Sequence, residues 1–105
     1  MADYLLLYSG GKMPETEQEQ AQVMKAWTDW FGTLGGALKD GGNPFTQAAK
    51  TIKSDGSVSD GAAGSASGYS VIQADSIDEA TALAKDCPVL MGGASVSVYE
   101  TFEVM

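Results

Sequence analysis

Residues 69–83, YSVIQADSIDEATAL, contain a strand-like run that passes directly into a capped helix. The run 69–75 has apolar residues for two buried faces, which is typical of a short buried strand. Ser76 and Glu79 then stand at capping-box spacing, in which two side chains satisfy backbone N–H groups of the first helical turn. A narrow apolar stripe follows, and Cys87-Pro88 should end the helix because a residue before proline disfavours helical geometry. The sequence therefore predicts a strand followed by a short helix.

The first part of the chain repeats this order of signals. Residues 3–8, DYLLLY, precede the sequence SGG and are too short a run for a helix, which predicts a first strand buried on both faces. After a break at Met13-Pro14, Thr16 and Glu19 repeat the capping-box spacing. Apolar residues then recur every three to four positions, at Val23, Trp27, Trp30, Phe31, Leu34 and Leu38. This spacing predicts an amphipathic helix with an aromatic stripe, ended by DGGNP at residues 40–44.

The remaining segments supply a hairpin and a last strand. Residues 45–53 are a weak strand signal, the sequence SDGS at 54–57 is a hairpin turn, and a short strand should start at Val58. The small-residue run 60–68 is expected to be a mobile loop. Residues 95–105 alternate between apolar and polar side chains, which predicts the last strand.

This order of elements is that of the ferredoxin-like β-α-β-β-α-β sandwich, an α+β fold. We expect one domain over residues 1–105. Because both helices of this plan cover the same face of the sheet, the other face needs a partner. A chain of this length has modest stability alone, so association with a second copy is expected.

Composition excludes several classes of function. Six lysines, no arginine and fourteen acidic residues give a net charge of −8, which argues against nucleic-acid and anionic-membrane partners. The start of the chain has no basic segment before an apolar run, and no stretch is long enough to span a bilayer, so a cytoplasmic location is expected. With one cysteine and no histidine, neither a zinc site nor a histidine base is available, and no metal or cofactor is expected.

Seven segments, in the order of the chain, resemble the YCII-related (DGPF) domain family. They are YLLLY at 4–8, Trp27 with Trp30, GGNPF at 41–45, Asp60-Gly61, Gly68-Tyr69, DSIDEA at 75–80 and Cys87-Pro88. The resemblance spans nearly the whole chain and implies a dimeric α/β barrel, in which two sheets pack face to face. It also implies a cleft between each sheet and its helices and loops. Some relatives are regarded as small-molecule lyases or isomerases that use a His and Asp pair, and others accompany alternative sigma factors.

The chain departs from the family motif at the position of that pair. Asp60-Gly61 is followed by two alanines where the family has Pro and Phe. Of the His and Asp pair only Asp60 is carried over, so a proton transfer there would need another group or a bound water.

Two carboxylates and three aromatic residues are the candidate site. Asp60 is carried over from the family motif, and a regular strand would place Glu100 among apolar neighbours, where it could act as an acid or base. Alternatively, a bulge or edge position turns Glu100 to water. Tyr8, Trp27 and Tyr69 could line an aromatic ligand pocket, or they could simply be core.

Two functions remain open at this point. The first is a homodimeric, non-catalytic module that binds a small molecule or a protein partner. The second is a weak lyase or isomerase that uses Asp60 or Glu100 in a cleft lined by the three aromatic residues. The absence of histidine and arginine favours the first function.

Overall fold

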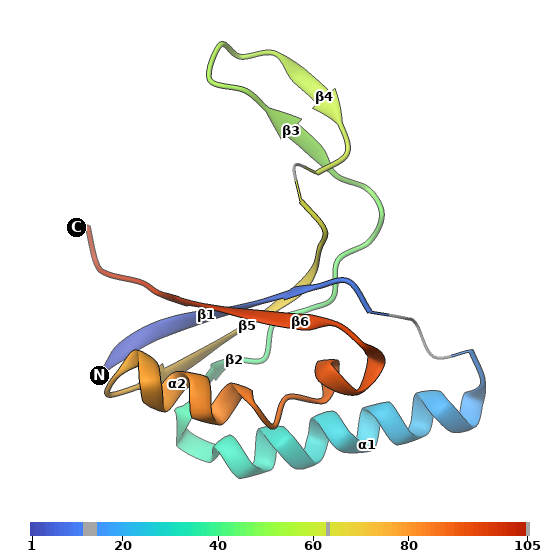
Figure 1. Cartoon of the computed structure of the whole chain (residues 1–105), viewed down its shortest axis with the longest axis vertical. Helices are drawn as coiled ribbons and strands as arrows, with labels where there is room; N and C mark the ends of the chain where they lie inside the picture. Colours follow the sequence, from blue (N-terminus) through green and yellow to red (C-terminus); the bar gives the residue numbers. More distant parts are fainter. Residues whose placement is uncertain (12–14, 63, 105) are drawn as a thin grey trace.

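A four-stranded antiparallel sheet forms the centre of the molecule in this computed structural model, which describes residues 1–11, 15–62 and 64–104 (Figure 1). The order of the strands across the sheet is β2-β5-β1-β6. Their bounds are β1 Ala2–Ser9, β2 Leu38–Asp40, β5 Ala66–Ala74 and β6 Ser95–Glu100. This order confirms the ferredoxin-like plan, with β2 and β5 as its second and third strands.

Both α-helices lie on the same side of the sheet (Figure 1). They are α1 (Glu17–Leu34) and α2 (Ile77–Ala84), and short 3-10 turns follow each of them, η1 at Gly35–Ala37 and η2 at Pro88–Gly92. The two predicted caps are confirmed, because the hydroxyls of Thr16 and Ser76 accept the N–H groups of Glu19 and Glu79 at 3.1 Å. The break expected at Met13-Pro14 lies outside the described residues.

The first helix is shorter than its apolar spacing predicted. It ends at Leu34 because Gly35 adopts a positive φ of 53° and donates its N–H to the carbonyl of Phe31. Leu38, which the pattern placed on the helix, instead begins β2 and pairs with Ile72. Leu38 lies four residues after Leu34, which is the spacing of one helical turn. The apolar spacing therefore could not show that the helix had already ended and that Leu38 begins a strand.

The predicted hairpin forms, but it is an insertion and not part of the main sheet. Strands β3 (Lys50–Ile52) and β4 (Val58–Asp60) pair only with each other, and the prediction of a strand over 45–53 was too long. We call residues 50–60 the arm. The predicted loop 60–68 is also shorter, because β5 already begins at Ala66 and pairs there with Ser9.

The last strand ends earlier than predicted. It stops at Glu100, and residues 101–104 continue without strand pairing, while Met105 lies outside the described residues. Only Thr101 is still held, by donating its N–H and its hydroxyl to the carbonyl of Asp3. We call residues 101–104 the exit segment.

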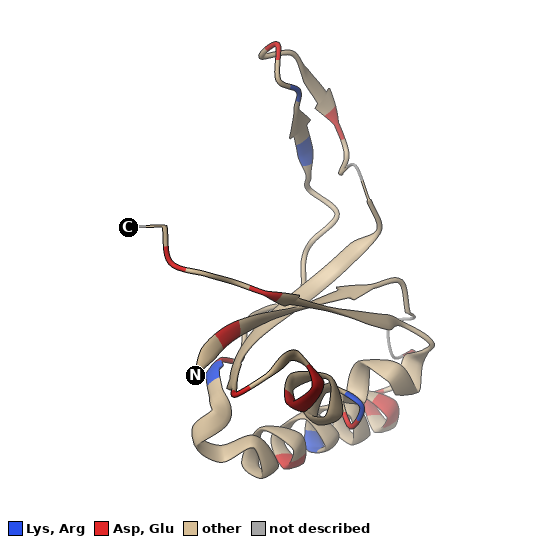
Figure 2. Cartoon of the chain, turned by 60° about the vertical axis from the view of Figure 1, so that its left-hand side comes forward, with Lys and Arg blue, Asp and Glu red and all other residues tan. Residues whose placement is uncertain are grey.

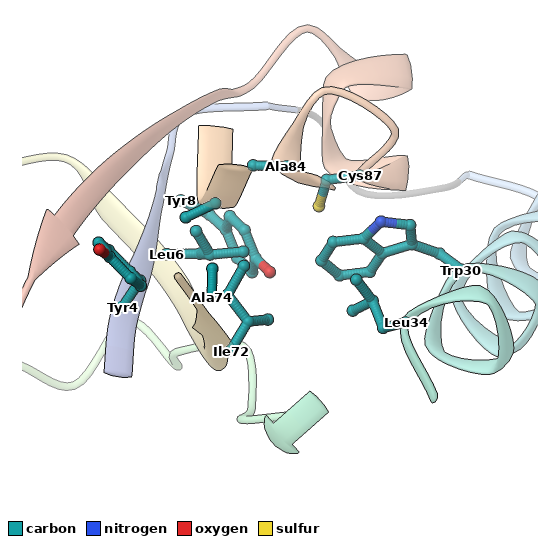
Figure 3. Packing of buried hydrophobic residues seen from close by; sticks show 10 residues of the cluster. Tyr4, Leu6, Tyr8, Trp30, Leu34, Ile72, Ala74, Ala84 and Cys87 are labelled. Carbon is teal, nitrogen blue, oxygen red and sulfur yellow. The ribbon is translucent and has the colours of Figure 1, made fainter. Parts of the chain in front are cut away.

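The helix side of the sheet carries the core. Side chains alternate along β1 and β5, and those on the helix side are buried. They pack against Trp30 and Leu34 of α1 and against Ala80 and Ala84 of α2, together with Cys87 (Figure 3). The sheet residues of this core are Tyr4, Leu6, Tyr8, Ile72 and Ala74.

The opposite side of the sheet is uncovered by the part of the chain that the structure describes. Its apolar residues form two rows across three strands, one through Tyr99, Leu5 and Val71 and one through Leu7 and Tyr69. We call these five residues the open face. The leucines are only half-buried and Tyr99 is 52% exposed, so the prediction that the first strand is buried on both faces is wrong for a single chain.

The arm and the exit segment both leave on the side of the open face. Figures 1 and 2 show them on the side of the sheet away from the helices. Because these segments extend from the body of the molecule, its radius of gyration is 15.2 Å, compared with roughly 13 Å for a compact chain of this length. The two segments therefore border the open face.

Candidate functional site

A buried hydrogen-bond chain lies between the sheet and the connection after β2. The hydroxyl of Tyr8 donates to the hydroxyl of Ser70 at 2.7 Å, and Ser70 donates to the carbonyl of Gly41 at 2.8 Å. Burial raises the pKa of the Tyr8 hydroxyl, so it stays protonated near neutral pH. Because all of these polar groups are satisfied and Ser70 is fully buried, the chain of bonds holds the sheet to residue 41.

Trp27 joins the predicted site residue Tyr8 to the aromatic stripe of α1. Its ring lies 5.6 Å from the ring of Tyr8 with an interplanar angle of 63°, and also 5.6 Å from the rings of Trp30 and Phe31. The indole N–H of Trp30 donates to the carbonyl of Leu83 at 3.2 Å. This arrangement is the packed interior between sheet and helices, as the core-packing alternative for these residues predicts.

The third aromatic candidate lies on the other side of the sheet. Tyr69 pairs with Leu7 in the sheet, whereas Tyr8 pairs with Gly68, so Tyr8 and Tyr69 lie on opposite faces. The ring of Tyr69 stacks on Phe45, with ring centroids 6.0 Å apart. In a single chain, Tyr69 therefore belongs to the open face and does not share a cleft with Tyr8 and Trp27.

Asp60 lies at the end of the arm's second strand. Its carboxylate binds the ammonium of Lys50 at 2.6 Å, and its side chain is 91% exposed. A shallow hollow of about 500 Å³ lies beside it, at the base of the arm. The hollow is lined by Gln47, Ala48, Ala49, Lys50, Asp60 and Gly61, so none of the aromatic candidates reaches it.

Glu100 lies at the opposite end of the sheet, on the helix side. It pairs with Tyr4, and its carboxylate accepts the Tyr4 hydroxyl at 3.0 Å. Burial, followed by this hydrogen bond, raises the pKa of Tyr4. The strand is regular here, without the bulge of the alternative prediction, but its end position leaves Glu100 exposed. Glu100 thus acts as a hydrogen-bond acceptor for a core tyrosine.

Two sets of contacts beside the open face were not predicted from the sequence. Phe45 is 48% exposed and forms the aromatic pair with Tyr69, whereas its place in the sequence indicated only the GGNPF segment and the start of a weak strand. Asp3 accepts hydrogen bonds from Lys39 and Gln73, and the hydrogen bond from Lys39 is the main reason that the pKa of Asp3 is lowered. Since these contacts join residues 24 to 70 positions apart, no local pattern could have indicated them.

Charged residues lie on the helices and also on the arm. Figure 2 shows acidic residues along both helices. A second hollow, of about 350 Å³ between α1 and η2, includes Asp29 and Asp86 in its lining. Within the described ranges, no group of three or more Cys, Asp or Glu side chains is placed to hold a metal ion. No helix in those ranges is long and apolar enough to cross a bilayer.

The sheet order and helix placement define a ferredoxin-like α+β subunit. Among solved structures, the chain is similar to 5-chloro-2-hydroxyhydroquinone dehydrochlorinase from Burkholderia phenoliruptrix, in complex with 2,5-dihydroxybenzoquinone. The TM-score is 0.53 at 20% sequence identity, and the match covers 95% of this chain and 93% of that chain. This likeness supports the fold. No protein-family model and no curated protein sequence matches the chain.

Proposed function

We propose that this chain is a homodimeric, non-catalytic binding module and a divergent relative of the YCII-related proteins. The open face is the observation that carries the proposal. It presents Leu5, Leu7, Tyr69, Val71 and Tyr99 as one apolar surface across three strands. Contiguous exposed apolar surface of this kind marks an interaction site in a soluble domain.

A second copy is the partner that fits this surface. The chain carries a net charge of −8, so two copies repel unless their carboxylates lie away from the contact. Many of the acidic residues follow the helices on the other side of the sheet (Figure 2). On the side of the open face, Asp3 pairs with Lys39 and Asp60 with Lys50, while Asp55 and Glu103 lie on the arm and the exit segment, outside the open face. Face-to-face packing of two sheets would bury both open faces in one apolar interior.

The ligand class follows from the groups at the rim of that interior. Tyr69 and Phe45 stack where the chain enters β5, next to the base of the arm. Flat aromatic faces favour a neutral, planar or apolar small molecule. We therefore assign the ligand site to the Tyr69–Phe45 end of the open face.

The dispersal of the acid and base candidates supports a non-catalytic role. Asp60 lies on the arm in an exposed ion pair, and Glu100 lies at the far end of the sheet in a hydrogen bond to Tyr4. The Tyr8 hydroxyl is held in a buried hydrogen bond. General acid–base catalysis needs such groups within hydrogen-bond reach of one bound substrate.

The alternative is a lyase or isomerase that uses Asp60 or Glu100. The structural neighbour favours it, because that protein of the same fold is described as a dehydrochlorinase and binds a dihydroxybenzoquinone. This alternative predicts turnover of a chlorinated hydroxyhydroquinone that is lost in the variant Asp60→Asn or Glu100→Gln. The binding module predicts no chloride release by the unmodified chain.

A thermal-shift screen against neutral and acidic, aromatic and aliphatic metabolites tests the binding role. A ligand at about 100 times its Kd adds about 2.7 kcal/mol, which raises the Tm of a domain of this size by roughly 10 °C or more. We expect neutral planar compounds to give this shift, Tyr69→Ala to lose it, and Tyr69→Phe to keep it because the ring remains. The variant Asp60→Asn should respond like the unmodified protein.

Two outcomes contradict this assignment. A shift that survives Tyr69→Ala would place the ligand elsewhere, and a shift lost in Asp60→Asn would move the site to the hollow at the base of the arm. No shift across the screen would favour the accessory role with a protein partner over the small-molecule role.

A further inference from the structure

The arm is a two-stranded hairpin that stands away from the body of the protein. It is held by its own contacts, with Lys53 donating its N–H to Ser57 at 2.8 Å and the Lys50–Asp60 ion pair at its base. Ile52 and Val58 pair directly across it and are 72% and 58% exposed. An isolated two-stranded hairpin with an exposed apolar pair is marginal in water, so this one requires a surface to pack on.

The exit segment has the same property at the other end of the sheet. Phe102 and Val104 are 81% and 83% exposed, although Thr101 anchors the segment to β1. The pairing of the strands shows at which end of the sheet each segment lies. The arm rises where Ser9 pairs with Ala66, and the exit segment rises where Tyr4 pairs with Glu100.

Symmetry then limits how two copies can meet. If two sheets pack face to face about a twofold axis along the strands, the two arms meet at one end and the two exit segments at the other. If the axis runs across the strands, each arm lies over the exit segment of the partner. The contact between arm and exit segment then occurs twice in the dimer, in two copies related by the twofold axis.

Charge selects the second arrangement. Lys53 adjoins Ile52 on the arm, and among the described side chains it has no salt-bridge partner. Glu103 lies between Phe102 and Val104 in the exit segment. The arm's other charges are Lys50 and Asp60, which pair with each other, and Asp55, whose carboxylate accepts hydrogen bonds from Ser57 in the turn. Exit segment against exit segment would bring two glutamates together, whereas arm against exit segment places Glu103 beside Lys53.

We propose that, in the homodimer, the arm of each copy packs on the exit segment of the other. Ile52 and Val58 meet Phe102 and Val104, and Lys53 lies beside Glu103. This inference rests on the proposed homodimer and specifies how it is assembled. It also explains why the arm and the exit segment, each with an exposed apolar pair, leave on the same side of the sheet as the open face.

Cross-linking between two variants, each with one added cysteine, tests the arrangement. Val58→Cys and Val104→Cys are purified separately, mixed to exchange subunits, and treated with a short bis-maleimide. We expect a covalent dimer in the mixture that contains one chain of each variant, and little from either variant alone. The unmodified protein is the control, because its Cys87 is 2% exposed and burial raises the pKa of its thiol.

Sedimentation of the same samples separates the two ways of failing. Dimers without the mixed cross-link, or with strong cross-linking of Val58→Cys alone, would overturn the arm arrangement and leave the dimer standing. Monomers throughout would overturn both the arrangement and the proposed homodimer.

Charge reversal gives an independent measurement. Two symmetric ion pairs at the surface predict that Lys53→Glu raises the dimer Kd by about 5- to 30-fold. Adding Glu103→Lys to the same chain should restore the affinity. Lys85→Glu, the same change on an exposed residue just after α2 on the helix side, is the matched control and should leave the Kd unchanged. If Lys85→Glu weakens the dimer as much as Lys53→Glu, net charge and not this contact is responsible.

Discussion

Gly42 holds the connection after β2 against the start of β5. Its φ is +68°, a region that disfavours any side chain, and a Cβ at this position would lie 1.8 Å from the carbonyl oxygen of Tyr69. The backbone therefore passes the sheet at a distance that only glycine permits. This close approach also places Gly41 where its carbonyl accepts the Ser70 hydroxyl.

Replacing Gly42 by alanine should destabilise the protein by about 2–4 kcal/mol, from the strained φ and the overlap with backbone. Urea denaturation measures the free energy of unfolding. Gly36→Ala is the control, since a Cβ there meets nothing within 4 Å and its φ is not positive. Equal stability of the two variants would show that residues 41–43 are free to move away from β5.

Residue position also explains why the three aromatic candidates do not lie together. Tyr8 and Trp27 do contact each other, as large apolar side chains with helix and strand spacing should. Tyr69 was grouped with them, but the pairing of Tyr8 with Gly68 turns the next residue to the other face. A shift of one residue in the strand pairing decides on which face of the sheet a side chain lies. The amino-acid composition does not contain that information.

At the scale of the elements, α2 depends strongly on its cap. It is eight residues long, too short to be stable alone, and the Ser76 hydroxyl satisfies the N–H of Glu79 in its first turn. Ala80 and Ala84 bury their methyl groups against the sheet. Local capping and tertiary packing therefore act together to define this helix.

Ser76→Ala should cost about 1 kcal/mol of stability, because the first turn loses its side-chain acceptor. Thr81→Ala is the matched control. Its hydroxyl bonds to the carbonyl of Ile77 within the same helix, and alanine's better helix propensity offsets that loss. Chemical denaturation of both variants checks this expectation. A Thr81→Ala loss as large as that of Ser76→Ala would mean that any lost hydroxyl, and not the cap, matters.

At the scale of the whole molecule, the unequal faces of the sheet are the main feature. One face is packed by α1 and α2, and the open face is left half-buried although it carries five large apolar side chains. A single domain of this size buries only a limited fraction of its apolar surface. A partner that covers the open face would therefore add stability that the single chain lacks.

Val71→Lys should convert the proposed dimer to a monomer at tens of micromolar protein, because it places a charge in the middle of the proposed apolar interface. Met24→Lys on α1 is the control, since Met24 is 69% exposed on the helix side of the molecule. Light scattering gives the mass, and far-ultraviolet circular dichroism checks that both variants are folded. Dissociation caused equally by Met24→Lys would contradict the assignment of the interface to the open face.

The sequence by itself determined the first strand, the two helix starts, the hairpin and the last two strands of the main sheet. The caps at Thr16 and Ser76, the turn at 54–57 and the alternation from Ser95 to Glu100 are local signals, each made by residues within a few positions of one another. They were sufficient to predict a ferredoxin-like α+β fold, because few topologies connect such an order of elements.

Only the tertiary structure decided the end of the first helix, the edge strand β2 and the separation of Tyr8 from Tyr69. It also decided that the hairpin is an arm outside the main sheet and that Asp60 and Glu100 lie far from the aromatic core. Each of these depends on which strands pair and in what register. Pairing is set by contacts between residues distant in the chain, which a local pattern does not encode.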